Sequence, residues 1–181
     1  MQKYLYSITL NFFVPTSVVE KLRKVKVSGS IGYDWLNSPF AHCTVKAIYF
    51  GMKHPSPKEI ETWIQASRKI LSHQEPFQVT VKGITRFPTA IVADVHSETL
   101  RKLHRQLGRV LPSSQPEFEN QNYRPHVSIV MTAGEVSAIA PKTKAFGTFK
   151  VDRLQLMVWN MDNSEKPRTL VEFKLKKINR N

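Results

Sequence analysis

Two short segments of the sequence combine a histidine with a hydroxyl side chain two residues later. His42 precedes Thr44 in "AHCTVK". His126 precedes Ser128 in "PHVSIV". A β-strand sends alternate side chains to opposite faces, so each histidine would share a face with its hydroxyl partner. We therefore predict that each strand packs one face in the core and carries chemistry on the other.

A pair of histidines suits acid–base chemistry on a phosphodiester. Histidine titrates near neutral pH, so one ring can accept a proton from the attacking oxygen while the other donates a proton to the leaving oxygen. The hydroxyls of Thr44 and Ser128 can donate hydrogen bonds to the non-bridging phosphate oxygens, where negative charge accumulates. Lys46 and Arg124 are expected on the same faces as the histidines. We predict that these two cations also bind the phosphate.

Other site chemistries find little support in the sequence. Cys43 adjoins His42 but is expected on the opposite face of its strand, which disfavours a Cys–His nucleophilic pair. The sequence contains no phosphate-binding G-x-x-x-x-G-K-[ST] loop, no dinucleotide-binding fingerprint and no H-E-x-x-H zinc motif. We therefore expect neither a metal nor a cofactor. A purely structural role for either histidine is the alternative, because a single H-x-[ST] match often arises by chance.

The composition favours a globular protein that binds a polyanion. Of the 181 residues 41% are hydrophobic, which suffices for a core, and the formal net charge is +13. A strongly positive field attracts phosphates, so nucleic acid is the first expected partner. The single cysteine excludes an internal disulfide, and no apolar run has the length of a transmembrane helix. We expect a cytoplasmic monomer that does not bind membranes.

The elements around the two motifs occur in the same order twice. In each half of the chain a strand, a helix and a loop precede the histidine-bearing strand, which suggests an internal duplication. The first helix is expected to open with a capping box of Ser17 and Glu20, and the second with one of Ser56 and Glu59. A third helix is predicted at 97–111, and strands are predicted at 3–13, 39–50, 76–87, 89–95, 122–130, 146–161 and 168–178.

This order predicts an α+β fold. We expect one domain over residues 1–181, made of two pseudo-symmetric lobes with antiparallel sheets around a central cleft and helices on the outside. Each lobe would contribute one histidine to the cleft. Before the first motif, residues 27–39 have loop composition but carry Tyr33 and Trp35. These two rings are candidates for stacking on a nucleic-acid base, and the alternative is that they cover a small part of the core.

The two motifs resemble the signature of the 2H phosphoesterase superfamily, which consists of two H-x-[ST]-x motifs in which x is usually apolar. The matching segments are "HCTV" at 42–45 and "HVSI" at 126–129, and the likeness covers nearly the whole chain. The members it resembles most are the RNA 2',3'-cyclic phosphodiesterases, also called 2'-5' RNA ligases. The resemblance implies a bilobal α+β fold without metal or cofactor. It also implies His42 as proton donor and His126 as proton acceptor, with Thr44 and Ser128 on the phosphate.

The sequence departs from the family pattern in two places, which leaves the exact substrate open. No proline precedes the first histidine, and no arginine follows "HVSIVM". The leading hypothesis is a metal-independent phosphodiesterase that opens a 2',3'-cyclic phosphate at an RNA 3' end to a 2'-monophosphate. A second hypothesis is a 2',5'-phosphodiesterase or weak 2'-5' RNA ligase, acting on 2',5'-linked or cyclic-phosphate nucleotides. A third is a non-catalytic RNA- or nucleotide-binding module, which the presence of both complete motifs disfavours.

Overall fold

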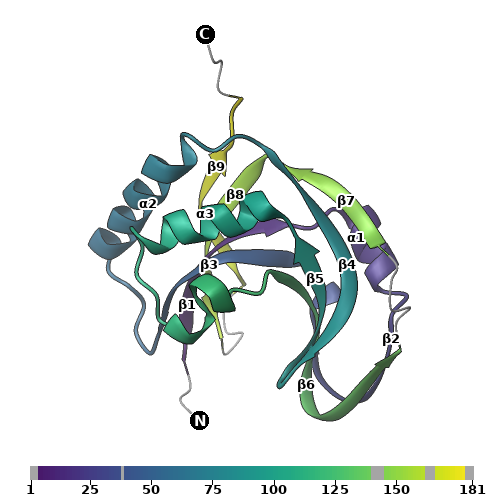
Figure 1. Ribbon diagram of the computed structural model, residues 1–181. Helices are drawn as coiled ribbons and strands as arrows, with labels where there is room; N and C mark the ends of the chain where they lie inside the picture. Colours follow the sequence, from purple (N-terminus) through teal and green to yellow (C-terminus); the bar gives the residue numbers. More distant parts are fainter. Residues whose placement is uncertain (1–3, 38, 140–144, 162–165, 178–181) are drawn as a thin grey trace.

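Alternating apolar and polar residues favour β-strands, and the computed structural model joins the strands of the described residues in one antiparallel sheet (Figure 1). The structure describes residues 4–37, 39–139, 145–161 and 166–177. The strand order is β7-β4-β5-β6-β3-β1-β8-β9, and β2 pairs with β6 outside this path. The strands are β1 Tyr6–Phe13, β2 Lys26–Asp34, β3 His42–Gly51, β4 Phe77–Phe87, β5 Ala90–His96, β6 His126–Ile139, β7 Ala145–Val151, β8 Arg153–Asn160 and β9 Arg168–Lys174.

The sheet has two halves that meet at the two histidine-bearing strands. One half contains β7, β4, β5, β6 and β2, and the other contains β3, β1, β8 and β9. β3 and β6 are neighbours at the centre, although they begin far apart in the sequence. The predicted α+β class is confirmed, and the central position of β3 and β6 puts both motifs at the junction of the halves.

Within the described residues three α-helices lie outside the sheet: α1 Thr16–Leu22, α2 Pro57–Leu71 and α3 Glu98–Gly108. In Figure 1, α2 and α3 lie side by side, and α3 contacts β3 and β4. α2 begins at the predicted capping box, in which the Ser56 N–H donates to Glu59 Oε2 at 2.8 Å. The box expected at Ser17 is wrong, because α1 begins after Pro15 without a side-chain cap. None of the described helices is both long and apolar enough to cross a membrane.

The structure departs from the predicted elements in two segments. Most of 27–39, expected as a loop, is the strand β2 followed by the 3-10 turn Trp35–Asn37. Long pairing with β6 imposes this conformation on a segment whose composition is weak for a strand. The strand expected at 146–161 is two strands, because the chain leaves β4 at Asp152 and crosses to pair with β1. The connection between the strands expected at 146–161 and 168–178, residues 162–167, lies largely outside the described residues.

Candidate active site

The junction of β3 and β6 brings the two motifs together. Cys43 and Val127 are Cα partners there, and both side chains are fully buried on the core face. Since side chains alternate along a strand, the neighbours of these two residues share the opposite face, and antiparallel pairing sets each histidine across from the other motif's hydroxyl. This group is His42, Thr44, His126 and Ser128. Burial raises the pKa of the Cys43 thiol to about 12, so the thiol stays protonated and is a poor nucleophile.

Both histidine rings are oriented by the same kind of hydrogen bond. Nδ1 of His42 lies 2.7 Å from the carbonyl oxygen of Phe40. Nδ1 of His126 lies 2.7 Å from the carbonyl oxygen of Arg124. A carbonyl can only accept, so each Nδ1 carries the hydrogen. The other ring nitrogen, Nε2, is therefore the atom that can accept or donate a proton during a reaction.

His42 sits against two indole rings. Its ring centroid is 4.7 Å from that of Trp159 and 5.5 Å from that of Trp35. Burial lowers the pKa of His42 to about 4; the carbonyl of Phe40 opposes this shift and the charge of His126 adds to it. At neutral pH the ring is therefore uncharged, which is the form that accepts a proton.

Among the residues that the structure describes, an acidic neighbour acts on His126 and none acts on His42. Asp94 on β5 is its Cα partner, and the Thr85 hydroxyl donates to Asp94 Oδ2 at 2.7 Å. Burial lowers the pKa of His126, and the Phe87 ring contributes to this burial with an edge contact at a centroid distance of 4.8 Å. The carbonyl of Arg124 and the carboxylate of Asp94 oppose the shift. These surroundings favour a proton on His126 rather than on His42.

Replacing Asp94 with Asn is expected to move the basic limb of the pH–rate profile to lower pH. Burial then lowers the pKa of His126 without an opposing carboxylate, so the protonated ring is lost earlier as the pH rises. Turnover at pH 7 should fall by roughly three- to tenfold and recover on acidification. Asp152→Asn, at an exposed carboxylate paired with Arg153, is the control and should leave the profile unchanged. Identical profiles for the two variants would contradict this role of Asp94.

A chain of hydrogen bonds links the first motif to the indole over His42. The Thr44 hydroxyl donates to Oδ1 of the fully buried Asn11 at 3.0 Å, and Asn11 Nδ2 donates to Thr9 Oγ1 at 2.7 Å. Trp159 Nε1 donates to the same Thr9 oxygen at 2.8 Å. This chain fixes the indole of Trp159 in its contact with the imidazole. In the free protein the proton of Thr44 thus points to Asn11 rather than outward.

The side chains of Ser128 and Arg124 have no comparable hydrogen-bond or ion-pair partner among the described residues. Among the described residues, none forms a hydrogen bond with the hydroxyl of the half-buried Ser128. Arg124 is exposed just before Pro125, and within the described part of the chain its guanidinium has no ion-pair partner. Both groups are therefore available to an incoming anion. Phosphate binding by Ser128, Thr44 and Arg124 stays a prediction.

Lys46 does not share the face of Thr44, so the prediction for its position is wrong. In the β1–β3 ladder Asn11 pairs with Thr44 and Leu10 pairs with Lys46, which leaves Val45 as an extra residue. Such a β-bulge reverses the alternation of the residues that follow. The Lys46 side chain is consequently buried on the core face, where its Nζ lies 2.5 Å from Glu119 Oε1.

Trp35 lies next to the first histidine, and Tyr33 lies next to Trp35. Tyr33 ends up on β2 and is 42% exposed, and its ring meets that of Trp35 edge-on at 5.0 Å. Trp35 in turn contacts the His42 ring, so the pair forms part of one wall beside the catalytic candidate. Base stacking by these two rings stays a prediction.

Sequence reasoning missed three residues that shape the surroundings of the histidines. Asn11 and Asp94 each stand alone as a polar residue in an otherwise apolar run, which is a usable signal for a buried hydrogen-bonding role. Trp159 carries no such signal, because an aromatic residue in a strand usually packs in the core. Among the residues that the structure describes, no group of three or more His, Cys, Asp and Glu side chains is placed to hold a metal ion.

Comparison with known proteins adds a family and a fold. The model of the 2'-5' RNA ligase superfamily matches residues 14–163. A comparison with curated proteins gives no match. A crystal structure described as a phosphoesterase superposes with a TM-score of 0.73 at 14% identity, covering 97% of this chain and 100% of that one.

Two further solved structures are similar along most of their length. Escherichia coli LigT complexed with NADP+ gives a TM-score of 0.71 at 13% identity, over 97% of this chain and 100% of LigT. The protein TT0787 of Thermus thermophilus gives a TM-score of 0.62 at 16% identity, over 93% of this chain and 97% of that one. At such low identity, these likenesses establish a shared fold.

Proposed function

Because the chain belongs to the 2'-5' RNA ligase superfamily, we propose that it is a metal-independent phosphodiesterase that opens 2',3'-cyclic phosphates at RNA 3' ends. One observation carries the proposal. The two imidazoles meet at a single strand junction, each held through Nδ1 and each with Nε2 left for proton transfer. Two rings in different surroundings are what an acid–base pair acting on one phosphate requires.

We assign the roles of the two rings in this reaction from their surroundings. Neutral His42 accepts a proton from water through Nε2, and the water oxygen forms a bond to phosphorus. The bond from phosphorus to the 3' oxygen breaks, and protonated His126 donates its Nε2 proton to that oxygen. The product is a 2'-monophosphate with a free 3' hydroxyl. This assignment is the reverse of the one that the family resemblance implies. It rests on a difference between the rings: burial lowers the pKa of both, to about 4 for His42, while the carboxylate of Asp94 opposes the shift only at His126.

Charge and relatives support an RNA or nucleotide substrate. The net charge of +13 favours a polyanion over a small neutral ligand. Structures of E. coli LigT include complexes with ATP and with 3'-AMP, so a related fold accommodates nucleotides. The family description also keeps a second candidate, cleavage or weak ligation of 2',5' linkages by the same residues.

An assay in the presence of a chelator tests the proposal directly. Purified protein with EDTA should convert an oligonucleotide ending in a 2',3'-cyclic phosphate into the 2'-monophosphate at the rate seen without EDTA, because the histidines transfer both protons. A parallel reaction contains a 2',5'-linked oligoadenylate. Faster cleavage of the latter would replace the first proposal with the second. Activity that vanishes in EDTA and returns with a divalent ion would contradict the mechanism.

A further inference from the structure

The two halves of the sheet share little backbone pairing where the histidines meet. β3 and β6 have a single pair of Cα partners, Cys43 and Val127, whereas β3 pairs with β1 along most of its length. The relative position of the two motifs decides whether both rings reach one phosphate. Further contacts must therefore hold the first motif against the segment that leads into the second.

The bulge in β3 leaves carbonyl groups that this segment and α3 satisfy. Val45, the extra residue of the bulge, accepts a hydrogen bond from Nδ1 of the buried His104 at 2.8 Å. The carbonyl of Thr44 accepts from the Tyr123 hydroxyl at 2.9 Å. The rings of His104 and Tyr123 stack in parallel, with centroids 3.7 Å apart. Thr44 and Val45 are thus held from the core side of β3, opposite the face that carries the histidines.

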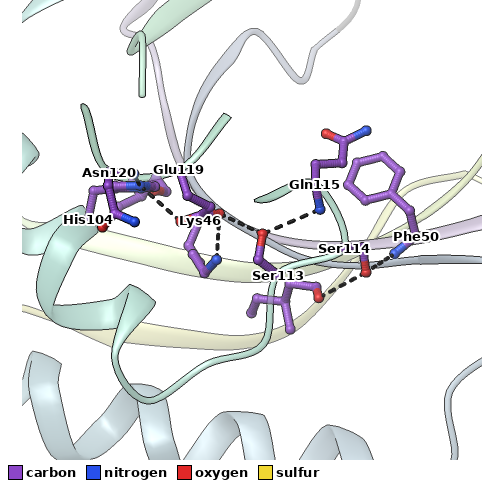
Figure 2. A network of polar contacts seen from close by, with 10 residues as sticks. Lys46, Phe50, His104, Ser113, Ser114, Gln115, Glu119 and Asn120 are labelled. Atoms are coloured by element: carbon purple, nitrogen blue, oxygen red, sulfur yellow. Dashed lines mark hydrogen bonds and ion pairs between the residues drawn. The ribbon is translucent and has the colours of Figure 1, made fainter. Parts of the chain in front are cut away.

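An ion pair completes this set of contacts, as Figure 2 shows. Lys46 Nζ contacts Glu119 Oε1 at 2.5 Å, and the Ser113 hydroxyl donates to the same oxygen at 2.8 Å. Glu119 belongs to the segment between α3 and β6, which ends at the second motif. We call Lys46, His104, Glu119 and Tyr123 the brace.

We propose that the brace positions the two catalytic motifs relative to each other. It connects the bulge beside His42 and Thr44 to the segment that enters β6 at His126, and so sets how far apart the two Nε2 atoms lie. The inference rests on the proposed function, since it assigns the brace to the reaction of the two histidines.

The chemistry of the brace fits positioning better than stability alone. A buried ion pair adds little net stability compared with apolar residues of similar size, because both charges lose their hydration. Directional hydrogen bonds to defined carbonyls instead restrict the strand to one geometry. Geometry matters for catalysis because a misplacement of about 1 Å can lower a rate roughly 100-fold.

Tyr123→Phe tests the brace with the smallest change. It removes the bond to the Thr44 carbonyl and keeps the ring stacked on His104. We expect kcat to fall roughly tenfold while KM stays within about twofold. The matched control is Tyr49→Phe. Tyr49 lies on β3, as Thr44 does, but away from the motifs, and its hydroxyl donates to the Lys53 carbonyl at 2.8 Å. Equal kcat values for the two variants, measured below their melting temperatures, would contradict positioning.

A pair of substitutions at His104 separates positioning from packing. Asparagine can place an amide N–H where Nδ1 donates to the Val45 carbonyl, whereas leucine fills the space without a donor. His104→Asn is therefore expected to keep kcat within about threefold of the wild type, and His104→Leu to lose roughly tenfold. Equal losses would show that the bond to Val45 does not act in catalysis.

Phosphate binding tests the positioning role of the brace independently of turnover. Inorganic phosphate bound between the histidines should shift the NMR signals of both rings with one common affinity in the wild type. In Tyr123→Phe we expect this affinity to fall at least roughly threefold. If the wild type does not open the cyclic phosphate, the proposed function fails and the titration still tests the brace. If turnover is present but the wild type and Tyr123→Phe bind phosphate equally and have equal kcat, the positioning role of the brace is contradicted and the proposed function stands.

Discussion

Alanine in place of either His42 or His126 is expected to lower turnover of a cyclic phosphate by roughly 100-fold or more, the usual contribution of a positioned proton transfer. Neither substitution should unfold the protein or abolish RNA binding, because the two side chains are only half-buried. The double variant should be scarcely slower than the slower single variant, since proton donor and acceptor act as one unit. Steady-state kinetics with a cyclic-phosphate oligonucleotide provides the measurement.

The control for this experiment is His73→Ala. His73 is an exposed histidine just after α2, where its Nδ1 lies 3.1 Å from the Lys69 carbonyl. Its loss should leave kcat unchanged. Structural histidines would behave differently from a catalytic pair, with mild and additive losses of rate together with a lower melting temperature. Near-wild-type turnover in either folded variant, His42→Ala or His126→Ala, would end the two-histidine mechanism and favour the binding-module hypothesis.

The second large effect concerns the division of roles between the two rings. In a 3'-deoxynucleoside 2'-(p-nitrophenyl phosphate), p-nitrophenolate takes the place of the leaving 3' oxygen, and this anion leaves without needing a proton. The loss caused by His126→Ala should therefore shrink from roughly 100-fold to about tenfold or less. The loss caused by His42→Ala should persist, because the attacking oxygen must still give up its proton. Comparing the two variants on this substrate and on the cyclic phosphate measures the difference.

The opposite pattern would reverse the assignment. If the activated substrate restores the turnover of His42→Ala and not that of His126→Ala, then His42 is the proton donor, as the family resemblance implies. Substrate would in that case have to raise the pKa of His42 well above the value of about 4 that burial imposes in the free protein. The electrostatic asymmetry created by Asp94 would then not determine the roles.

The motifs themselves could be predicted because they depend on local patterns. Strand alternation puts His42 with Thr44 and His126 with Ser128, whatever the strands pair with. The start of α2 at Ser56 is equally local, since the capping box, the proline and the apolar stripe lie within one segment. The +13 charge requires no structure at all.

The sequence by itself thus determined which residues are the candidates for catalysis, while tertiary pairing decided which neighbours surround and hold them. The bulge at Val45 turns Lys46 into the core because of its register with β1, and no local signal marks that extra residue. Asp94 acts on His126 only because β5 pairs with β6 in one register, and Trp159 covers His42 only because β8 pairs with β1. Register and bulges arise from contacts between distant segments, which local periodicity does not encode.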